Sequence, residues 1–175
     1  LSYRLTAGDF NLTLGGNFSY ITTNLINAGN ESGILDRGSM HQMGTVVRGE
    51  NGMPFPYFYG YKTDGIFQNW DEVNAYTYTD ASGNVKLIQP EAQPGDFRYK
   101  DLDGDGAITA EGDRQMLGKC VPPITYGLHA SMDWKGIDFS MVWQGVYGNK
   151  IFDATRRTDI PSMNQPAYVL GRWTG

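Results

Sequence analysis

Two segments of the chain alternate apolar and polar residues with a period of two, the pattern of a β-strand whose two faces meet different surroundings. In residues 10–23 (FNLTLGGNFSYITT) the large apolar residues hold even positions, and residues 1–6 form a weaker strand before a turn at Ala7-Gly8-Asp9. Residues 124–147 (ITYGLHASMDWKGIDFSMVWQGVY) repeat the alternation on two arms around Lys135-Gly136. The sequence therefore predicts two hairpins, residues 1–23 and residues 124–147.

The aromatic residues on these arms are spaced to fit a membrane. Tyr126 and Trp134 lie eight residues apart, or roughly 26 Å of strand at about 3.3 Å per residue. Phe139 and Tyr147 repeat this spacing. In tilted strands it fits an apolar band about 20 to 25 Å tall between two rows of interfacial aromatic residues, as on an outer-membrane barrel. A soluble antiparallel sheet with one face on a core produces the same alternation, so periodicity alone leaves both possibilities open.

Residues 24–123 join the two hairpins and show little sustained periodicity, so we expect no second set of alternating strands there. A segment of this length is too long for an ordinary loop and must hold local structure. Asn69 followed by two acidic residues predicts a short helix over residues 69–76, and Ser82-Gly83-Asn84 predicts a small exposed hairpin within residues 76–87. The short turns and the long connection alternate along the chain, which places the short turns on one side of a sheet and the long segment on the other.

Composition excludes several classes of function. The 175 residues carry 14 Lys and Arg against 19 Asp and Glu, a net charge of −5 without a basic run, so we expect no nucleic-acid partner. Cys120 is the single cysteine, which excludes an intramolecular disulfide and a CxxC site, and we expect it to be a small buried hydrophobe rather than a nucleophile. No apolar run is long enough for a membrane-spanning helix.

The sharpest local motif is residues 101–109 (DLDGDGAIT), which match the first nine positions of an EF-hand-type calcium loop. Carboxylates occupy positions one, three and five, and a glycine occupies position six. Position twelve is Gly112, which cannot supply a ligand, so Asp113 or Glu111 must close the site. We expect a structural Ca²⁺ clamp; the alternative is an acidic turn that binds nothing. The predicted metal ligands are Asp101, Asp103, Asp105, Ala107, Thr109 and Asp113.

Aromatic residues crowd residues 54–67 (PFPYFYGYKTDGIF), with six rings in fourteen positions. Tyr57, Tyr59, Tyr61 and Trp70 are candidates for contacts with a substrate or partner, because aromatic faces stack on sugars. The alternative is that the rings form a small core that holds the long segment together. The chain has two histidines, His41 and His129, at no recognisable nucleophile or metal spacing, so we expect no catalytic residues and no enzyme.

Several of these motifs together resemble the C-terminal part of SusC/RagA-type TonB-dependent outer-membrane transporters. The resemblance covers most of residues 10–150, in the family's order. Its motifs are residues 60–68 (GYKTDGIFQ), 94–106 (PGDFRYKDLDGDG), Asp113-Arg114, Leu117-Gly118, 123–127 (PITYG), 134–140 (WKGIDFS) and 144–149 (QGVYGN). The resemblance implies a barrel of about 22 strands with a plug, a SusD-type surface lipoprotein as partner, the TonB system as motor, and import of glycans or peptides across the outer membrane.

We therefore expect an all-β chain that is a fragment of a transmembrane antiparallel β-barrel in the lipid bilayer, with about four strands. Because it begins at Leu1 without an initiator Met, we expect a piece of a longer chain. The expected parts are a barrel hairpin at 1–23, a large, partly structured extracellular loop with the acidic turn at 24–123, a barrel hairpin at 124–147 and the start of a further extracellular loop at 148–175.

The alternative hypothesis is a secreted, soluble, β-rich carbohydrate-binding module stabilised by calcium. The apolar strand faces distinguish the two, because lipid-facing strands need no opposing sheet whereas a sandwich does. The barrel hypothesis fails if Leu128, Met132, Phe139 and Met141 are buried against another sheet of the same chain.

Overall fold

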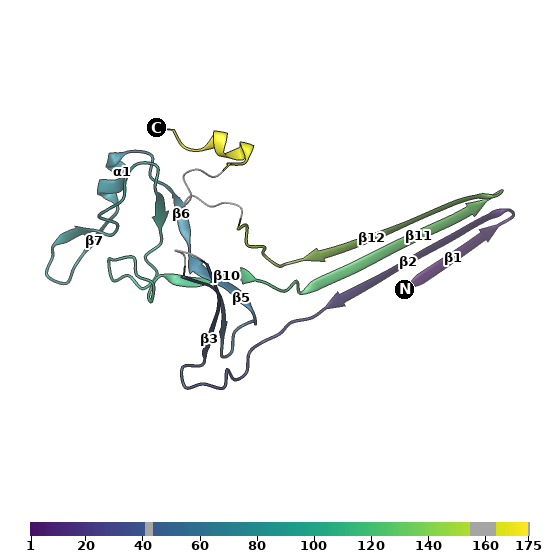
Figure 1. Cartoon of the computed structure of the whole chain (residues 1–175), viewed down its shortest axis with the longest axis horizontal. Coiled ribbons are helices and arrows are strands. Elements are labelled where there is room, and N and C mark those ends of the chain that lie inside the picture. The colour runs from purple at the N-terminus through teal and green to yellow at the C-terminus, as the bar shows by residue number, and fades with distance from the viewer. Residues whose placement is uncertain (41–43, 155–163, 175) are drawn as a thin grey trace. The chain divides into compact units, whose positions relative to one another are not determined.

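The computed structural model describes residues 1–40, 44–154 and 164–174, and most of its regular structure is β-strand (Figure 1). The chain divides into two compact units, residues 1–58 with 118–151 and residues 59–117 with 152–175. The boundary passes through β5 (Tyr57–Tyr61) and the end of β10 (Arg114–Lys119). Among the described residues, no helix has both the length and the apolar character needed to cross a membrane.

The first unit contains an antiparallel sheet of long strands in the order β1-β2-β11-β12 (Figure 1). Its strands are β1 (Ser2–Ala7), β2 (Phe10–Tyr20), β11 (Ile124–Trp134) and β12 (Ile137–Tyr147). Both predicted hairpins are confirmed. The positive φ angles of Lys135 (48°) and Gly136 (84°) are those of a tight turn that follows the twist of the strands.

The connections of this sheet follow the predicted pattern. β2 pairs with β11 along its whole length, from Phe10 opposite Trp134 to Tyr20 opposite Ile124. Because of this register, the turns at residues 8–9 and 135–136 lie at the same end of the sheet. Residues 21–123 therefore leave and re-enter the sheet at the opposite end.

The large apolar side chains of β1, β2 and β11 share one face of this sheet with those at odd positions of β12. Leu128, Met132, Phe139 and Met141 remain 51%, 38%, 48% and 37% exposed. None of the four is buried against another sheet of the described chain, so the condition that would refute the barrel hypothesis is not met.

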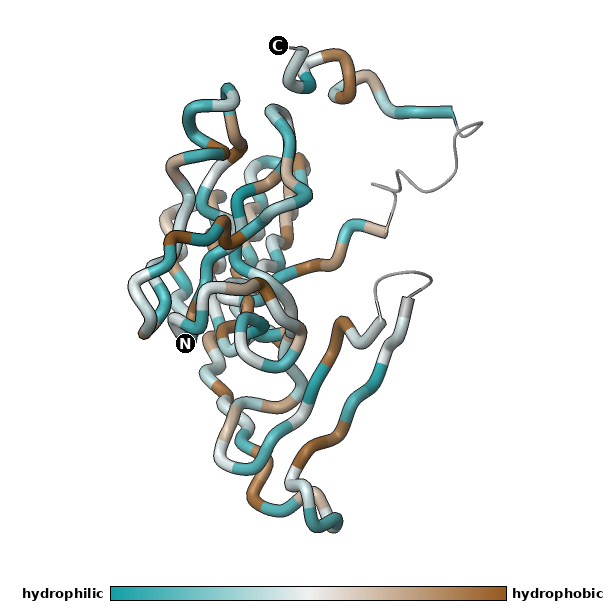
Figure 2. Tube along the Cα trace, turned by 90° about the vertical axis from the view of Figure 1, so that its left-hand side faces the viewer, coloured by the Kyte–Doolittle hydropathy of each residue, from teal (hydrophilic) through white to brown (hydrophobic). Residues whose placement is uncertain are grey.

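Residues 24–123 contain a second sheet, which the sequence pattern did not predict. Its order is β10-β5-β4-β3, with β3 (Ile34–Met40) and β4 (Gly44–Glu50) forming a hairpin. Figure 2 shows short apolar stretches interrupted by polar ones along this hairpin. Gly38, with φ of 64°, lies opposite Val46, and the register is the same on both sides of these two residues. The order Ile34-Leu35 then Asp36-Arg37 does not alternate apolar and polar residues, so it lacks the period-two pattern on which sequence-based strand prediction relies.

The described residues of the second unit form short strands, an α-helix and a 3₁₀ helix. The helix α1 (Trp70–Ala75) confirms the prediction: the side chain of Asn69 accepts from the Glu72 amide (2.9 Å), and the Glu72 carboxylate accepts from the Gln68 amide (3.0 Å). Val73 packs with Phe67 and Ala92 in the core of the unit. The predicted hairpin is also confirmed. The remaining elements are β6 (Thr63–Ile66), β7 (Thr77–Thr79), β8 (Val85–Leu87), β9 (Phe97–Tyr99) and a 3₁₀ helix, η1 (Ala167–Gly171).

Candidate functional site

The acidic turn folds as a network of carboxylate-to-amide hydrogen bonds. Asp101 accepts from the amides of Gly104 (2.7 Å) and Gly106 (3.0 Å), one on each carboxylate oxygen. Asp103 accepts from the Asp105 amide (3.2 Å), and Asp105 from the Ala107 amide (2.9 Å). These bonds turn alternate side chains toward one point, and oxygens of the three Asp residues lie within 4.8 Å of one another.

Asp113 closes the turn from the other side. Its side chain is fully buried, and its two oxygens accept from the amides of Leu102 and Thr109, each at 2.6 Å. Glu111, the other residue considered for closure, is exposed. A Cβ on Gly112 would overlap the Asp103 carboxylate, so position twelve cannot carry a side chain without displacing Asp103. Asp113 thus fastens both ends of the turn from the next position along.

The donor set fits a hard cation. Calcium prefers oxygen ligands, chiefly from carboxylates, main-chain carbonyls and water. In the described part of the chain no Lys or Arg forms an ion pair with Asp101, Asp103 or Asp105. Each carboxylate oxygen has a second lone pair beyond its bond to an amide. The hydroxyl of Thr109, another predicted ligand, accepts from the Gly112 amide (2.9 Å).

Tyr76 connects the turn to the core of the second unit, a role that sequence reasoning missed. Its hydroxyl donates to the Tyr99 carbonyl (2.6 Å) and accepts from the Asp101 amide (3.4 Å), while its ring packs on Phe67 at a centroid distance of 5.9 Å. Burial raises the pKa of the Tyr76 phenol, which keeps the hydroxyl protonated and able to donate. No motif or spacing signals this contact, because it depends on the fold of the α1 region.

The four predicted binding aromatics lie in different surroundings. Tyr57 is 1% exposed and its hydroxyl donates to Glu50 (2.9 Å), and the Tyr59 ring is buried beneath the Arg114 guanidinium, 4.4 Å from its centroid. The same guanidinium lies 5.8 Å from the Tyr61 ring. Trp70 is 58% exposed. The burial of Tyr57 and Tyr59 is what a small core requires, whereas Trp70 presents a free ring, and a binding role for these residues stays a prediction.

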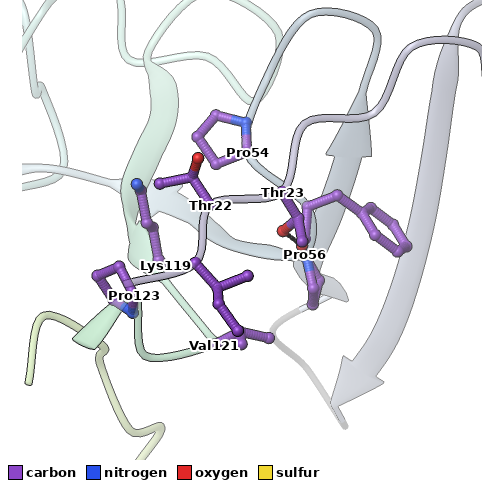
Figure 3. A pocket seen from close by; sticks show the side chains of 9 residues that line it. Thr22, Thr23, Pro54, Pro56, Lys119, Val121 and Pro123 are labelled. Carbon is purple, nitrogen blue, oxygen red and sulfur yellow. Dashed lines mark hydrogen bonds between the residues drawn. The ribbon is translucent and has the colours of Figure 1, made fainter. Parts of the chain in front are cut away.

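A small hollow lies where β2 and β11 continue into the long segment (Figure 3). The Thr23 hydroxyl donates to the Phe55 carbonyl (2.7 Å), and the Ile21 amide donates to the Pro123 carbonyl (2.8 Å). The outgoing and returning chains are therefore fastened to each other at the end of the sheet. Pro54, Pro56 and Pro123 line the hollow and restrict its backbone, with Lys119 as its charged group.

The apolar face of the long sheet is bounded by aromatic rows. At the end near the long segment, the register places Tyr20 and Tyr147 on either side of Ile124, and at the turn end it places Phe10 next to Trp134. The two rows are ten positions apart along β11, or about 33 Å of strand. At a tilt of about 40° the height of the face is about 25 Å, the apolar thickness of an outer-membrane barrel.

The opposite face of this sheet is mostly polar. It carries Asn11, Thr13, His129 and Asp133 on the two central strands, and the Asn11 amide donates to Asp133 (3.3 Å). His129 lies over Gly15, where a Cβ would overlap the imidazole. On the apolar face the Tyr126 ring covers Gly145 in the same way. Such ring-over-glycine pairs fix the register of neighbouring strands.

The single cysteine lies in surroundings that disfavour reactivity. Burial raises the pKa of the half-buried Cys120 thiol, which disfavours the reactive thiolate. His41 lies outside the described residues.

Comparison with known proteins supports the resemblance in part. No family model matches the chain. The chain is similar to three proteins of Formosa agariphila. It is 29% identical to TonB-dependent receptor P26 over 170 residues, which cover 90% of this chain and 16% of that protein. It is 27% identical to TonB-dependent receptor P39 over 168 residues (82% of this chain, 15% of that protein) and 27% identical to TonB-dependent receptor P3 over 120 residues (67% of this chain, 11% of that protein). The chain thus spans about a sixth or less of the length of these relatives. The similarities support a relationship between this chain and the TonB-dependent receptor family.

Proposed function

We propose that this chain forms part of the barrel wall and a large extracellular loop of a TonB-dependent outer-membrane importer of the SusC/RagA type. The observation that carries the proposal is the exposed apolar face of β1-β2-β11-β12, bounded by aromatic rows, in a chain similar to TonB-dependent receptors. Strands of about 9 to 11 residues cross a bilayer, and β2, β11 and β12 each have 11 residues.

In this proposal the two faces of the sheet contact different surroundings. The apolar face, with Leu128 and Phe139, contacts lipid, because a bilayer buries such a surface without an opposing sheet. The polar face, with Asn11 and Ser131, lines the aqueous interior, where hydroxyl and amide groups can hydrogen-bond to water or cargo. The chain binds and conducts rather than catalyses. Cargo, a glycan or peptide, is received with a SusD-type lipoprotein and drawn inward by the TonB system.

We also propose a structural Ca²⁺ at the acidic turn. Asp101, Asp103 and Asp105 would supply carboxylate oxygens, Ala107 a main-chain carbonyl and Thr109 a further oxygen, with Asp113 closing the turn. Bound there, the cation would offset the repulsion among the carboxylates. Its role would be to hold this part of the loop in one shape.

The second sheet within residues 24–123 is the one observation that favours the alternative, a secreted carbohydrate-binding module. That module would need a protein surface to cover Leu128 and Met132, and both are exposed in the described chain. The importer therefore remains the better supported function.

Cell fractionation tests the proposal. Cells producing the full-length protein are separated into soluble, inner-membrane and outer-membrane fractions, and intact cells are treated with protease. We expect the protein in the outer membrane, with cleavage inside residues 24–123 and protection of residues 124–147. Recovery in a soluble fraction would refute the importer, and binding to a glycan array would then test the alternative.

A further inference from the structure

The end of β4 leads into the chain's single Asn-Gly dipeptide, Asn51-Gly52, whose two residues are exposed in a turn. An Asn followed by Gly is prone to spontaneous deamidation, because glycine has no side chain to hinder attack by its own nitrogen. Asn51 loses ammonia when the Gly52 nitrogen gives up its proton and bonds to the side-chain carbonyl carbon. Water then opens the resulting succinimide at either carbonyl, giving aspartate or isoaspartate.

The folded hairpin restrains both groups that react, the Gly52 nitrogen and the Asn51 side chain. The attacking nitrogen, that of Gly52, donates its proton to the Leu25 carbonyl at 2.7 Å. The Asn51 side-chain oxygen accepts from the Ala28 amide at 2.8 Å, and the Asn51 amide nitrogen lies so close to Gly33 that a Cβ there would be 2.8 Å from it. The attack therefore requires the Gly52–Leu25 hydrogen bond to open, while the bond from Ala28 and the nearness of Gly33 limit rotation of the Asn51 side chain.

The same contacts hold the loop of residues 25–33 against the hairpin. The Asn51 main-chain amide donates to the Gly33 carbonyl (3.0 Å), and the Gly52 amide donates to Leu25. Isoaspartate inserts an additional methylene into the main chain between these two donors. The two donors then cannot keep their spacing, so both bonds cannot form together.

We propose that Asn51 is a site of spontaneous deamidation that the loop of residues 25–33 restrains, and that its conversion to isoaspartate releases this loop. The inference is independent of the transport proposal, since it depends only on contacts within the first unit.

The test measures deamidation in the full-length protein, purified in detergent and aged at pH 8 with and without urea. Peptide mapping by mass spectrometry quantifies aspartate and isoaspartate at position 51. We expect the native rate to be about thirtyfold below the unfolded rate, which corresponds to about 2 kcal/mol at 1.36 kcal/mol per tenfold. Equal rates in the two states would overturn the proposal.

Two variants remove the restraint separately. Ala28→Pro deletes the amide that holds the Asn51 side chain, and Gly33→Ala displaces that side chain. Each should raise the deamidation rate of the native protein toward that of the unfolded protein and leave the unfolded rate unchanged. A native rate that is unchanged in both variants would refute the restraint.

Loop release is tested with Asn51→Asp as the matched control, because this variant keeps a side-chain oxygen that can accept from the Ala28 amide and leaves the main chain unchanged. Limited proteolysis should cut residues 25–33 in isoaspartate-containing protein but not in Asn51→Asp, and equal protection of the two would refute the release.

Discussion

Leu128→Arg is the substitution that best separates a lipid-facing sheet from a sheet facing water. Leu128 lies on the apolar face of β11, one residue from the middle of the Ile124–Trp134 strand and about 3 Å along it. If the aromatic rows mark the two membrane interfaces, this position is near the bilayer midplane. An arginine there costs about 2 to 4 kcal/mol in a transmembrane barrel, which is about thirtyfold to a thousandfold in the folding equilibrium.

Ser131→Arg is the matched control. Ser131 lies two residues from the middle of the same strand but on the polar face, opposite Thr13 and Ser140. Urea unfolding of the full-length protein in lipid vesicles measures both variants against the wild type. We expect a large loss of stability for Leu128→Arg and a small one for Ser131→Arg. A soluble protein with Leu128 half exposed to water would tolerate both, since surface substitutions are usually within about 0.5 kcal/mol, so equal, small effects would refute the lipid-facing assignment.

Three further substitutions test local contacts. Asp80 accepts from the amides of Ser82 and Asn84 (both 2.9 Å), and its hydrogen bond to Lys86, together with these amides, lowers its pKa. The β7–β8 hairpin should therefore be most stable above the ordinary Asp pKa and lose that stability as pH falls through the lowered value; amide exchange should show this in wild type but not in Asp80→Asn. Gly145→Val should disrupt assembly of the proposed barrel, because the Tyr126 ring occupies the Cβ position. Heat-modifiable gel mobility measures this assembly. The control Gly136→Ala meets no neighbouring atom and should assemble despite its strained φ. Gly49→Val should displace the Phe55 ring and expose the segment around it to protease, and normal protection would contradict that packing.

The parts of the fold that sequence predicted are those whose patterns are local. The hairpins at 1–23 and 124–147 follow from period-two alternation around short turns, and the helix after Asn69 follows from one capping residue with acidic neighbours. The β3–β4 hairpin was not predicted because the apolar and polar residues of β3 do not alternate: Ile34 and Leu35 are followed by Asp36 and Arg37. Its ion pair between Arg48 and Asp36 (2.7 Å) joins residues on different strands, so no single window of sequence reports it.

In the candidate site, too, the sequence predicted the local contacts but not those between residues distant in the chain. The convergence of Asp101, Asp103 and Asp105 was predictable because alternate side chains in a tight glycine turn point to one side. The link from Asp101 through the Tyr76 hydroxyl to Tyr99 was not, because it joins a helix terminus to a strand far away in the sequence. The burial of Tyr57 and Tyr59 was left open for the same reason.

Metal removal distinguishes the effect of the proposed Ca²⁺ from that of the two hydrogen bonds that Asp113 accepts. Without a cation, three clustered carboxylates repel one another, so EDTA should speed amide exchange across residues 101–113 and added Ca²⁺ should restore protection. Asp103→Asn removes one charged ligand and should abolish the response of amide exchange to EDTA and Ca²⁺. It should leave the hydrogen bonds from the Leu102 and Thr109 amides to Asp113 intact.

Asp113→Asn should behave differently from Asp103→Asn. An amide offers one acceptor oxygen in place of two, so one of two buried amides loses its partner at a cost of about 1 to 3 kcal/mol. Protection should fall with or without Ca²⁺. Exchange that is identical with EDTA and with Ca²⁺ in the wild-type protein would contradict the clamp and leave an acidic turn held by the Asp113 hydrogen bonds alone.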